Sequence, residues 1–295
     1  MSNSICIYHN GNKNIISYYK NKFSNLKFVG NWAEFPYQDN SLYEISHADA
    51  TYENLFELKK ANIKIIRHIS DYGDDQKNIV NECHEQHYEQ WLSESVITFL
   101  SFSDEIVCDT EVESDNNGKH AIITTGRTAS THLEMYLKKN NIEAFENAKI
   151  NITNDKDTVN SNSATFLWRE NSWECLTSIW IGLQTQNFVH AYKNTPFNYE
   201  FGQIQEIPIA WLTNDGLNMC RYTMDLAIAY KFLLRKPINI QTHEEIIKHY
   251  KTNSIKIPYN KEKIIKNYYH TKEWYFQNLQ PMIDRLYIDT THLLS

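Results

Sequence analysis

Several features that direct a protein out of the cell or into a membrane are missing from this sequence. Its five cysteines are odd in number and scattered, without the paired spacing of a disulfide framework or a CxxC zinc site, so we expect reduced thiols. No run of about 18 apolar residues occurs, so we expect no membrane span. The opening residues show neither the basic region nor the apolar core of a signal peptide. These absences predict a cytoplasmic protein.

Excess basic charge is also missing. The formal net charge is -7, which argues against non-specific nucleic-acid binding, because proteins that bind in this way carry a basic surface. Local basic residues must therefore attract any anionic ligand. We expect no metal site either, although Cys83, His84 and His87 lie close in sequence and positions 83 and 87 would share one face of a helix.

The chain is long and apolar enough for one large domain or two smaller ones. It has 295 residues, of which 41% are hydrophobic. The polar stretch 111–120 contains Gly118 and several turn-forming residues, so it is the best candidate linker. We predict two domains: a small α/β domain over residues 1–117 and a nucleotide-binding domain over residues 118–295. The role of the first domain is unknown, with acceptor recognition and oligomerisation as the two options.

Hydrophobic patterning predicts an α/β fold, with a parallel sheet flanked by helices. The predicted strands are 3–9, 26–29, 42–47, 63–69, 105–108, the run that starts at His120, 142–146, 163–168 and 238–240. The predicted helices are 13–24, 52–61, 79–92, the run that continues through Leu133, 173–183, 212–236, the run that starts near His243, and 261–269.

The stretch from His120 to Leu133 has the pattern of an anion site. An apolar strand leads into a turn made of Gly126, Arg127 and small hydroxyl residues, and a helix follows. At the start of a helix, backbone N–H groups without helical partners point into the turn, and the positive end of the helix dipole lies behind them. The Arg127 guanidinium adds a charged fork that matches phosphate or sulfate. The pattern predicts a cradle for a phosphate-type group.

This turn has no Gly-Lys-Ser/Thr, so it is not a Walker A loop. It resembles instead the 5′-phosphosulfate loop of the sulfotransferases, in which a basic residue is followed by Ser/Thr, Gly, Ser/Thr and Ser/Thr. The matching residues are Arg127, Thr128, Ala129, Ser130 and Thr131, with Ala129 where the family usually has glycine. If that position requires a positive φ, alanine costs on the order of 1 kcal/mol relative to glycine, and donor binding is weaker.

A second motif extends the resemblance. Arg169 directly follows the predicted strand 163–168, and Ser178 lies on the helix after it. Sulfotransferases hold the 3′-phosphate of their nucleotide with an arginine and a serine placed in this way. Gln184 and Thr185, then Phe188 and His190, make the stretch similar to the branch typified by bacterial trehalose sulfotransferase.

The resemblance implies a sulfotransferase fold, which is related to the fold of the P-loop proteins. It also implies a sulfotransferase activity. The enzyme would transfer a sulfuryl group from 3′-phosphoadenosine-5′-phosphosulfate (PAPS) to a hydroxyl of a carbohydrate or another small acceptor, and would need no metal. Gly126 and residues 127–131 would hold the 5′-phosphosulfate, and Arg169 and Ser178 the 3′-phosphate. Arg127 would stabilise the leaving phosphate. The general base would be Glu146 or Glu143; the rivals for that role are His132, His190 and Glu174.

Two other functions remain open at this point. A P-loop kinase of nucleotides or small molecules would need a lysine in the loop, and the loop has none. A non-catalytic nucleotide-binding module would keep Arg127 and Arg169 without a base. The lysine-rich stretch 261–269 is read as a solvated helix face, with closure over the nucleotide as the alternative. The acceptor and the oligomeric state, a homodimer included, are left undetermined.

Overall fold

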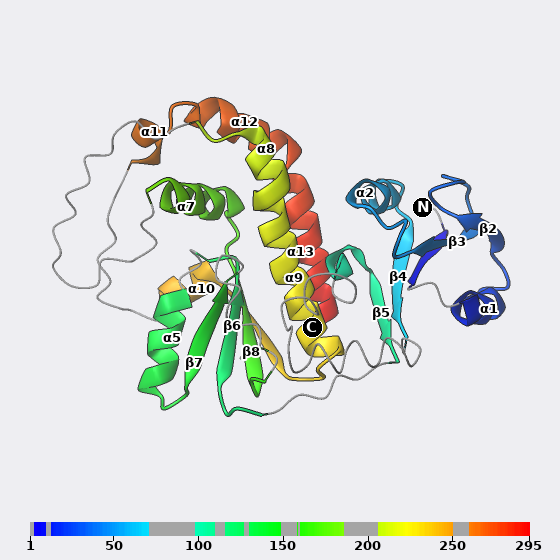
Figure 1. Ribbon diagram of the computed structural model, residues 1–295, viewed down its shortest axis with the longest axis horizontal. Coiled ribbons are helices and arrows are strands. Elements are labelled where there is room, and N and C mark those ends of the chain that lie inside the picture. Colours follow the sequence, from blue (N-terminus) through cyan, green and yellow to red (C-terminus); the bar gives the residue numbers. More distant parts are fainter. Residues whose placement is uncertain are drawn as a thin grey trace. The chain divides into compact units, whose positions relative to one another are not determined.

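The computed structural model describes residues 3–9, 13–70, 98–109, 116–126, 130–148, 158, 160–185, 206–249 and 260–295. The chain forms two compact units, each built around its own sheet (Figure 1). The first unit consists of Met1–Asp115, Met224–Ile238 and Leu286–Ser295, and the second of Asn116–Thr223 and Asn239–Arg285.

The first unit contains a parallel sheet, which within the described residues has five strands in the order β2-β3-β1-β4-β5. Its elements are β1 (Ile5–His9), α1 (Lys13–Lys22), β2 (Lys27–Asn31), β3 (Ser41–Ser46), α2 (Tyr52–Lys60), β4 (Lys64–Ile69), the 3₁₀ turn η1 (Leu100–Phe102) and β5 (Glu105–Cys108). Strands β1 and β4 are almost wholly buried, because helices cover both faces of such a sheet.

Helix α1 covers one face of the first sheet. Its Ile15, Ile16 and Tyr19 pack against Ile7 of β1 and Ile66 of β4. The connection from β1 to β2 runs to one side of β1, whereas the connection from β3 through α2 to β4 runs to the other side. Since crossovers between parallel strands are right-handed, α2 lies on the opposite face from α1.

The second unit contains a smaller sheet in the order β7-β6-β8-β9, in which β6 is parallel to both of its neighbours. Its elements up to Gly216 are β6 (His120–Thr124), α5 (Ser130–Lys139), β7 (Ala144–Ala148), β8 (Ser163–Trp168), α7 (Ser172–Thr185), α8 (Ile209–Trp211) and the π-helical turn η3 (Leu212–Gly216). Its later elements are β9 (Ile238–Thr242), α10 (His243–His249), α11 (Lys261–Ile264) and α12 (Tyr268–Asn278).

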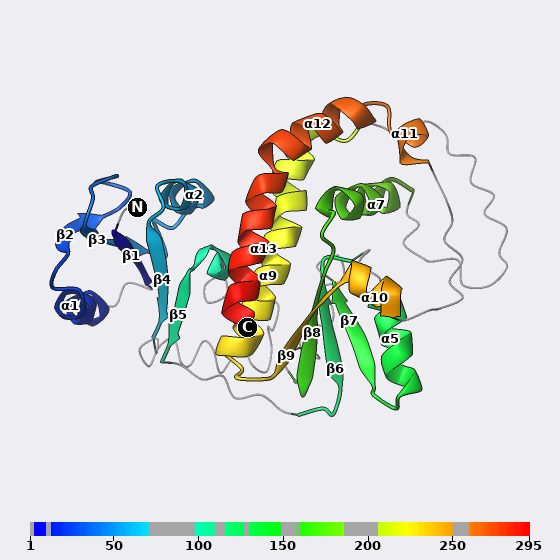
Figure 2. The same cartoon turned by 180° about the vertical axis from the view of Figure 1, so that it is seen from behind.

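Two long helices, α9 (Leu217–Phe232) and α13 (Gln280–Leu294), are shared by the two units, because each division of the chain falls inside one of them. They run side by side in both views (Figures 1 and 2). Within the first unit, Lys231 of α9 donates hydrogen bonds to the carbonyls of Leu293 and Leu294 in the last turn of α13, at 3.0 and 2.7 Å.

The structure shows the coarse class expected from the sequence, an α/β protein with a parallel sheet flanked by helices. It differs in that the first unit also takes segments 224–238 and 286–295, which the sequence analysis assigned to the second domain. The helix expected over 261–269 is two helices, since Ile265 leaves the helix with extended backbone angles and is buried. The helix expected over 79–92 lies outside the described residues.

Candidate functional site

The two motifs singled out in the sequence lie at the same edge of the second sheet. Strands β6 and β8 are parallel neighbours, with Ile123 opposite Phe166 and Thr124 opposite Leu167. Continuing this register by two residues places Gly126 beside Arg169, each just past the carboxyl end of its strand. Ligands of open α/β sheets bind at this edge. Two residues that are 43 positions apart in the sequence numbering therefore become neighbours by strand pairing.

The turn after β6 starts with a glycine in a left-handed conformation. Gly126 has φ 85°, a value that side-chain-bearing residues rarely adopt. Its N–H donates to the Thr124 hydroxyl at 3.1 Å, and its carbonyl accepts from the Cys175 thiol at 3.0 Å. The Thr125 hydroxyl lies 3.3 Å from the same sulfur. The start of the turn is thus attached to α7, the helix that follows Arg169.

The remainder of the turn is described only in part. Residues 127–129, and so Arg127, Thr128 and Ala129, lie outside the described residues. Ser130 is buried and begins α5, the position expected for a helix N-terminus behind a phosphate cradle. Thr131 is also in α5, but its side chain is not among those described.

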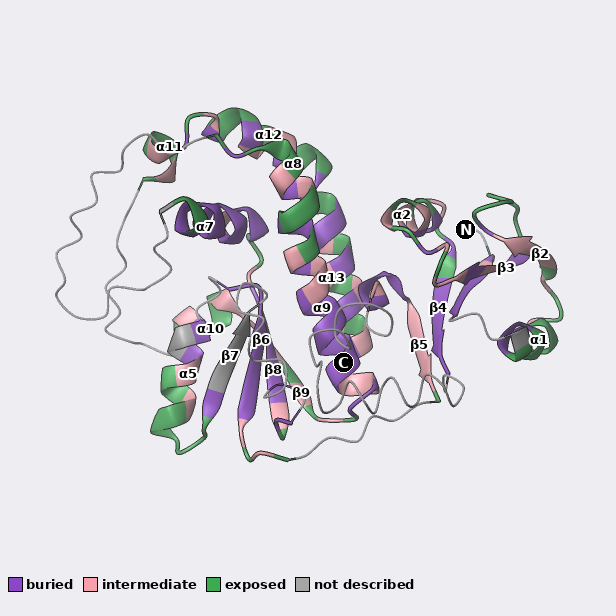
Figure 3. Cartoon of the chain, viewed as in Figure 1, coloured by how far each residue is buried: buried purple, intermediate pink, exposed green. Residues whose placement is uncertain are grey.

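Helix α7 is a largely buried element, drawn almost entirely in purple in Figure 3. Ser172, its first residue, has its hydroxyl 2.7 Å from the Tyr275 hydroxyl and donates to Gln280 Oε1, also at 2.7 Å. The indole of Trp173 donates to the Tyr268 hydroxyl at 3.3 Å. These contacts fix the amino end of α7 against α12 and α13, so the groups on its first turns are held in place.

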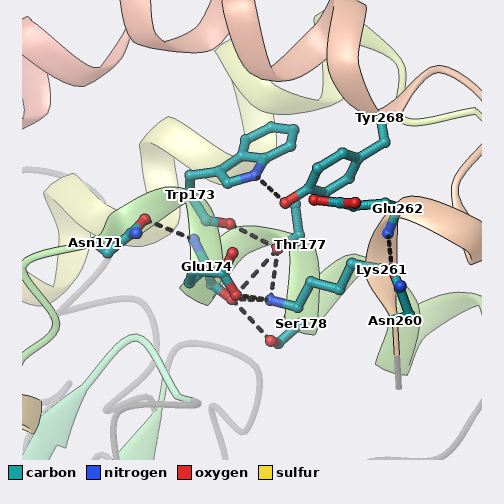
Figure 4. A network of polar contacts seen from close by, with 9 residues as sticks. All are labelled: Asn171, Trp173, Glu174, Thr177, Ser178, Asn260, Lys261, Glu262 and Tyr268. Carbon is teal, nitrogen blue, oxygen red and sulfur yellow. Dashed lines mark hydrogen bonds and ion pairs between the residues drawn. The ribbon is translucent and has the colours of Figure 1, made fainter. Parts of the chain in front are cut away.

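A lysine from α11 reaches the first two turns of α7 (Figure 4). Lys261 Nζ lies 2.5 Å from Glu174 Oε2, 2.8 Å from the Glu174 carbonyl oxygen and 2.9 Å from Thr177 Oγ1. An ammonium has three protons, and these three acceptors use all of them. The Lys261 side chain is only 12% exposed. The interpretation of Lys261 as part of a solvated helix face is therefore wrong.

The charges around Lys261 are close enough to affect its protonation. Burial lowers the pKa of the Lys261 ammonium, the contact with Glu174 raises it, and the nearby positive charge of Arg169 lowers it further. Arg169 and Lys261 are thus two cations in one neighbourhood, with the Glu174 carboxylate bound to one of them. Such a pair of cations favours an anionic ligand, which would compete with Glu174 for Lys261.

Ser178 lies on α7 as the sequence predicted, and it is buried. Its hydroxyl donates to the Glu174 carbonyl at 2.8 Å, one turn earlier in the same helix. Because the Ser178 hydroxyl already donates its hydrogen bond within its own helix, the hydroxyl must rotate before it can donate to a phosphate.

The candidate general bases are placed differently from one another. Glu143 precedes β7, at the amino end of the sheet, where its carbonyl accepts from the His120 N–H at 2.8 Å. The turn lies at the opposite end of β6, about 16 Å away for a five-residue strand at roughly 3.3 Å per residue. Glu143 therefore lies at the edge of the sheet opposite the turn, and its role as the base stays a prediction. Glu146 is paired with Ile122 in mid-sheet.

The side chain of Glu146 is not among those described, so its prediction is untested. The same holds for His132, whose backbone belongs to α5, and for His190, which lies outside the described ranges. Glu174 is the one candidate whose side chain is seen near the turn, and it is bound to Lys261. Sequence patterning alone could not have found this pairing, because it joins segments 87 residues apart.

Within the described ranges, no group of three or more His, Cys, Asp or Glu side chains is arranged to hold a metal ion. Cys83, His84 and His87 lie outside those ranges. None of the helices in the part of the chain that the structure describes combines the length and apolarity that a membrane crossing requires. Comparisons with protein-family models, with curated proteins and with solved structures find no match for the chain.

Proposed function

We propose that the second unit binds an adenine nucleotide with two phosphate-type groups, and that the protein is a PAPS-dependent sulfotransferase. The observation that supports this proposal is the parallel pairing of β6 and β8, because Gly126 and Arg169 each follow the carboxyl end of one of these strands. The contact between Cys175 and Gly126 supports it, because it ties the two motifs together at atomic distance.

In this proposal each motif holds one end of the donor. Arg127, the backbone amides of the turn and the hydroxyls of Thr128, Ser130 and Thr131 bind the 5′-phosphosulfate. Arg169 binds the 3′-phosphate, together with Ser178 after rotation of its hydroxyl. Lys261 is added to this group by its burial near Arg169. Positive charge at both ends of the nucleotide fixes its register relative to the acceptor.

The chemical step is a displacement at sulfur. The acceptor hydroxyl oxygen forms a bond to sulfur as the bond between sulfur and the 5′-phosphate oxygen breaks. Negative charge grows on the leaving 5′-phosphate, where Arg127 and the amides of the turn stabilise it. The hydroxyl proton passes to a general base, for which Glu146 is the first candidate. We propose a carbohydrate or another small hydroxyl compound as the acceptor.

A non-catalytic nucleotide-binding module is the second candidate, and one observation favours it. Lys261 and Ser178 both have their hydrogen bonds directed to Glu174 or its helical neighbours rather than outward. A site of this kind would bind the bisphosphate weakly and would not need a base.

The test measures binding and turnover separately. Isothermal titration with adenosine 3′,5′-bisphosphate is compared with titration with ATP and Mg²⁺, using wild type, Arg127→Ala, Arg169→Ala and Arg221→Ala. Arg221 is a matched control on α9, where its guanidinium donates to Asn218. We expect wild type and Arg221→Ala to bind the bisphosphate and the other two variants to lose measurable binding.

Turnover is then followed as transfer of ³⁵S from labelled PAPS to a panel of carbohydrate acceptors. Binding of the bisphosphate without transfer to any acceptor favours the non-catalytic module. Stronger binding of ATP with Mg²⁺ than of the bisphosphate contradicts the donor assignment and favours a kinase.

A further inference from the structure

A second group of polar side chains lies at the carboxyl edge of the first sheet. His9 ends β1, His68 is the next-to-last residue of β4, and Asp109 directly follows β5. Glu44, near the end of β3, belongs to the same group. The sequence analysis found no constellation in this part of the chain, because each of these residues stands alone at the end of a separate strand.

Two imidazoles in this group each face a carboxylate. His9 Nε2 lies 3.5 Å from Glu44 Oε2, and His68 Nε2 lies 2.7 Å from Asp109 Oδ2. Tyr8 pairs with Arg67 across β1 and β4, so continuing the register puts His9 beside His68 on the same face of the sheet. The two imidazole–carboxylate pairs are thus adjacent, on the face that α1 covers.

The two imidazoles have different polar surroundings. Burial lowers the pKa of His9, against the opposing effect of Glu44, so the ring is neutral near pH 7. Burial raises the pKa of the Tyr19 phenol, whose oxygen lies 2.9 Å from His68 Nδ1. The other ring nitrogen, His68 Nε2, faces the Asp109 carboxylate. The edge thus offers a neutral imidazole at His9, a second imidazole at His68 and several carboxylates.

The position of the His9–Glu44 pair is the one at which open parallel sheets bind small molecules. The chain leaves β1 through α1 on one face and leaves β3 through α2 on the other, so the two connections diverge between these neighbouring strands. In such sheets, ligands bind outside the carboxyl ends of the strands at this point of divergence. His9 and Glu44 come from the two strands on either side of it.

The charges at this edge do not suit an anion. Three carboxylates of described residues lie along it: Glu44, Asp109 and Asp49, the last of which accepts from Ser46 at 2.6 Å and from Asn31 at 2.8 Å. Arg67 is fully buried, with its guanidinium 3.7 Å from the centre of the Tyr8 ring. Carboxylates that accept, next to imidazoles that donate or accept, match a ligand with many hydroxyl groups.

We propose that the carboxyl edge of the first sheet, centred on His9, Glu44 and His68, binds an uncharged, hydroxyl-rich ligand such as a sugar. The side chains of Glu44 and Asp109 are 31% and 60% exposed, so an arriving ligand meets the carboxylates first. The imidazole edges lie behind them. This site is independent of the nucleotide site proposed for the second unit, and either can exist without the other.

The test is an NMR titration of the histidine side chains of the full chain. The signals of His9 and His68 are assigned with His9→Gln and His68→Gln. The probes are the methyl α-glycosides of glucose, galactose and mannose, each added to saturation, with inorganic phosphate as the anionic probe. We expect at least one glycoside to shift both histidine signals along a saturable curve, and phosphate to leave them unchanged.

A matched pair of variants locates the effect. Glu44→Gln removes one carboxylate at the carboxyl edge, and Glu105→Gln removes one at the amino edge of the same sheet, where Glu105 lies 2.6 Å from Lys64. We expect Glu44→Gln to weaken glycoside binding about tenfold and Glu105→Gln to leave it unchanged. Three results overturn the proposal: no shift with any glycoside, a saturable shift with phosphate instead, or equal weakening by both variants.

Discussion

Lys261 and Glu174 are 87 residues apart in the sequence, yet the Lys261 ammonium lies 2.5 Å from Glu174 Oε2. The pair joins α11 to the first turn of α7, beside Arg169. Its geometry couples two properties of the protein, since Glu174 both secures α11 and neutralises a cation that an anionic ligand could use. Substitutions at the two positions are therefore expected to change anion binding in opposite directions.

The first prediction concerns this opposition. Glu174→Gln removes a negative charge and releases Lys261, so we expect the affinity for adenosine 3′,5′-bisphosphate to rise about threefold to tenfold; Lys261→Met should lower it by a similar factor. Lys261→Met also leaves the partly buried Glu174 carboxylate without its partner, which should reduce the free energy of unfolding by about 1–2 kcal/mol. Titration calorimetry and urea denaturation measure the two effects.

The control for these variants is Glu273→Gln, which makes the same charge change at an exposed position of α12. It should leave the bisphosphate affinity unaltered. If Glu174→Gln binds the bisphosphate no better than this control, Lys261 serves only to hold α11 in place.

A second prediction concerns the attachment of the turn to α7. Cys175→Ala removes the thiol that donates to the Gly126 carbonyl, and we expect a loss of about 1–2 kcal/mol in the free energy of unfolding. Bisphosphate affinity should fall as well, because the turn loses its anchor. Cys175→Ser keeps a donor at this position and should retain most of the affinity.

Cys220→Ala is the matched control, since Cys220 is also a buried thiol but lies on α9. This variant should lose stability without losing affinity. Equal affinity losses in Cys175→Ala and Cys220→Ala would show that the turn responds to general loosening and not to this contact.

The third prediction is a pH dependence of stability. His120 is buried, with ring nitrogens 2.7 Å from Ser163 Oγ and 2.9 Å from Thr165 Oγ1, and burial lowers its pKa. Below about pH 6.5 the unfolded chain binds a proton that the folded chain does not bind, so stability falls as the pH drops toward the folded pKa. Below that folded pKa the loss levels off.

His120 contributes at most about 1.4 kcal/mol per pH unit to this slope. His9 contributes in the same direction, because burial lowers its pKa too. Urea denaturation between pH 7.5 and 4.5 should show a shallower slope for His120→Gln than for wild type. His270→Gln, at an exposed position of α12, should leave the slope as it is; a slope that is the same in all three proteins contradicts the prediction.

A fourth prediction compares two neighbouring lysines of α2. Lys59 Nζ lies 2.6 Å from Asp104 Oδ1 and 3.1 Å from Asp289 Oδ2, and its side chain is 8% exposed. Lys59→Met leaves two carboxylates close together without their cation, so we expect a loss of about 3 kcal/mol. Lys60→Met breaks only an exposed pair with Glu57 and should cost about 0.5 kcal/mol or less. Urea denaturation measures both losses in the free energy of unfolding. Similar losses in the two variants would contradict the stabilising role assigned to Lys59.

Much of the fold could be predicted from the sequence where local pattern decides it. The strand predicted over 163–168 has those bounds in the structure, because a continuous apolar run ends at the charged Arg169. The predicted helix 261–269 failed at Ile265, whose backbone turns extended while its side chain is buried. Helical periodicity contains no information about such a break, since the core that receives Ile265 is formed by distant segments.

The candidate site could be predicted only as separate pieces. Gly126 and Arg169 were identifiable because each follows a predicted strand, and the register of β6 and β8 then brings them together. Which of the nearby lysines is buried could not be predicted, because Lys261, Lys263 and Lys266 look alike in sequence. That Glu143 lies at the opposite edge of the sheet could not be predicted either, because sequence proximity to the phosphate helix does not say which edge a residue occupies.

The sharing of α9 and α13 between the two units has a consequence for biosynthesis. The strands of the first sheet are translated well before segments 224–238 and 286–295, which complete their unit. Until Asp289 is translated, Lys59 and Asp104 lack their third partner. Removing residues 286–295 would therefore destabilise a sheet that is synthesised much earlier than they are.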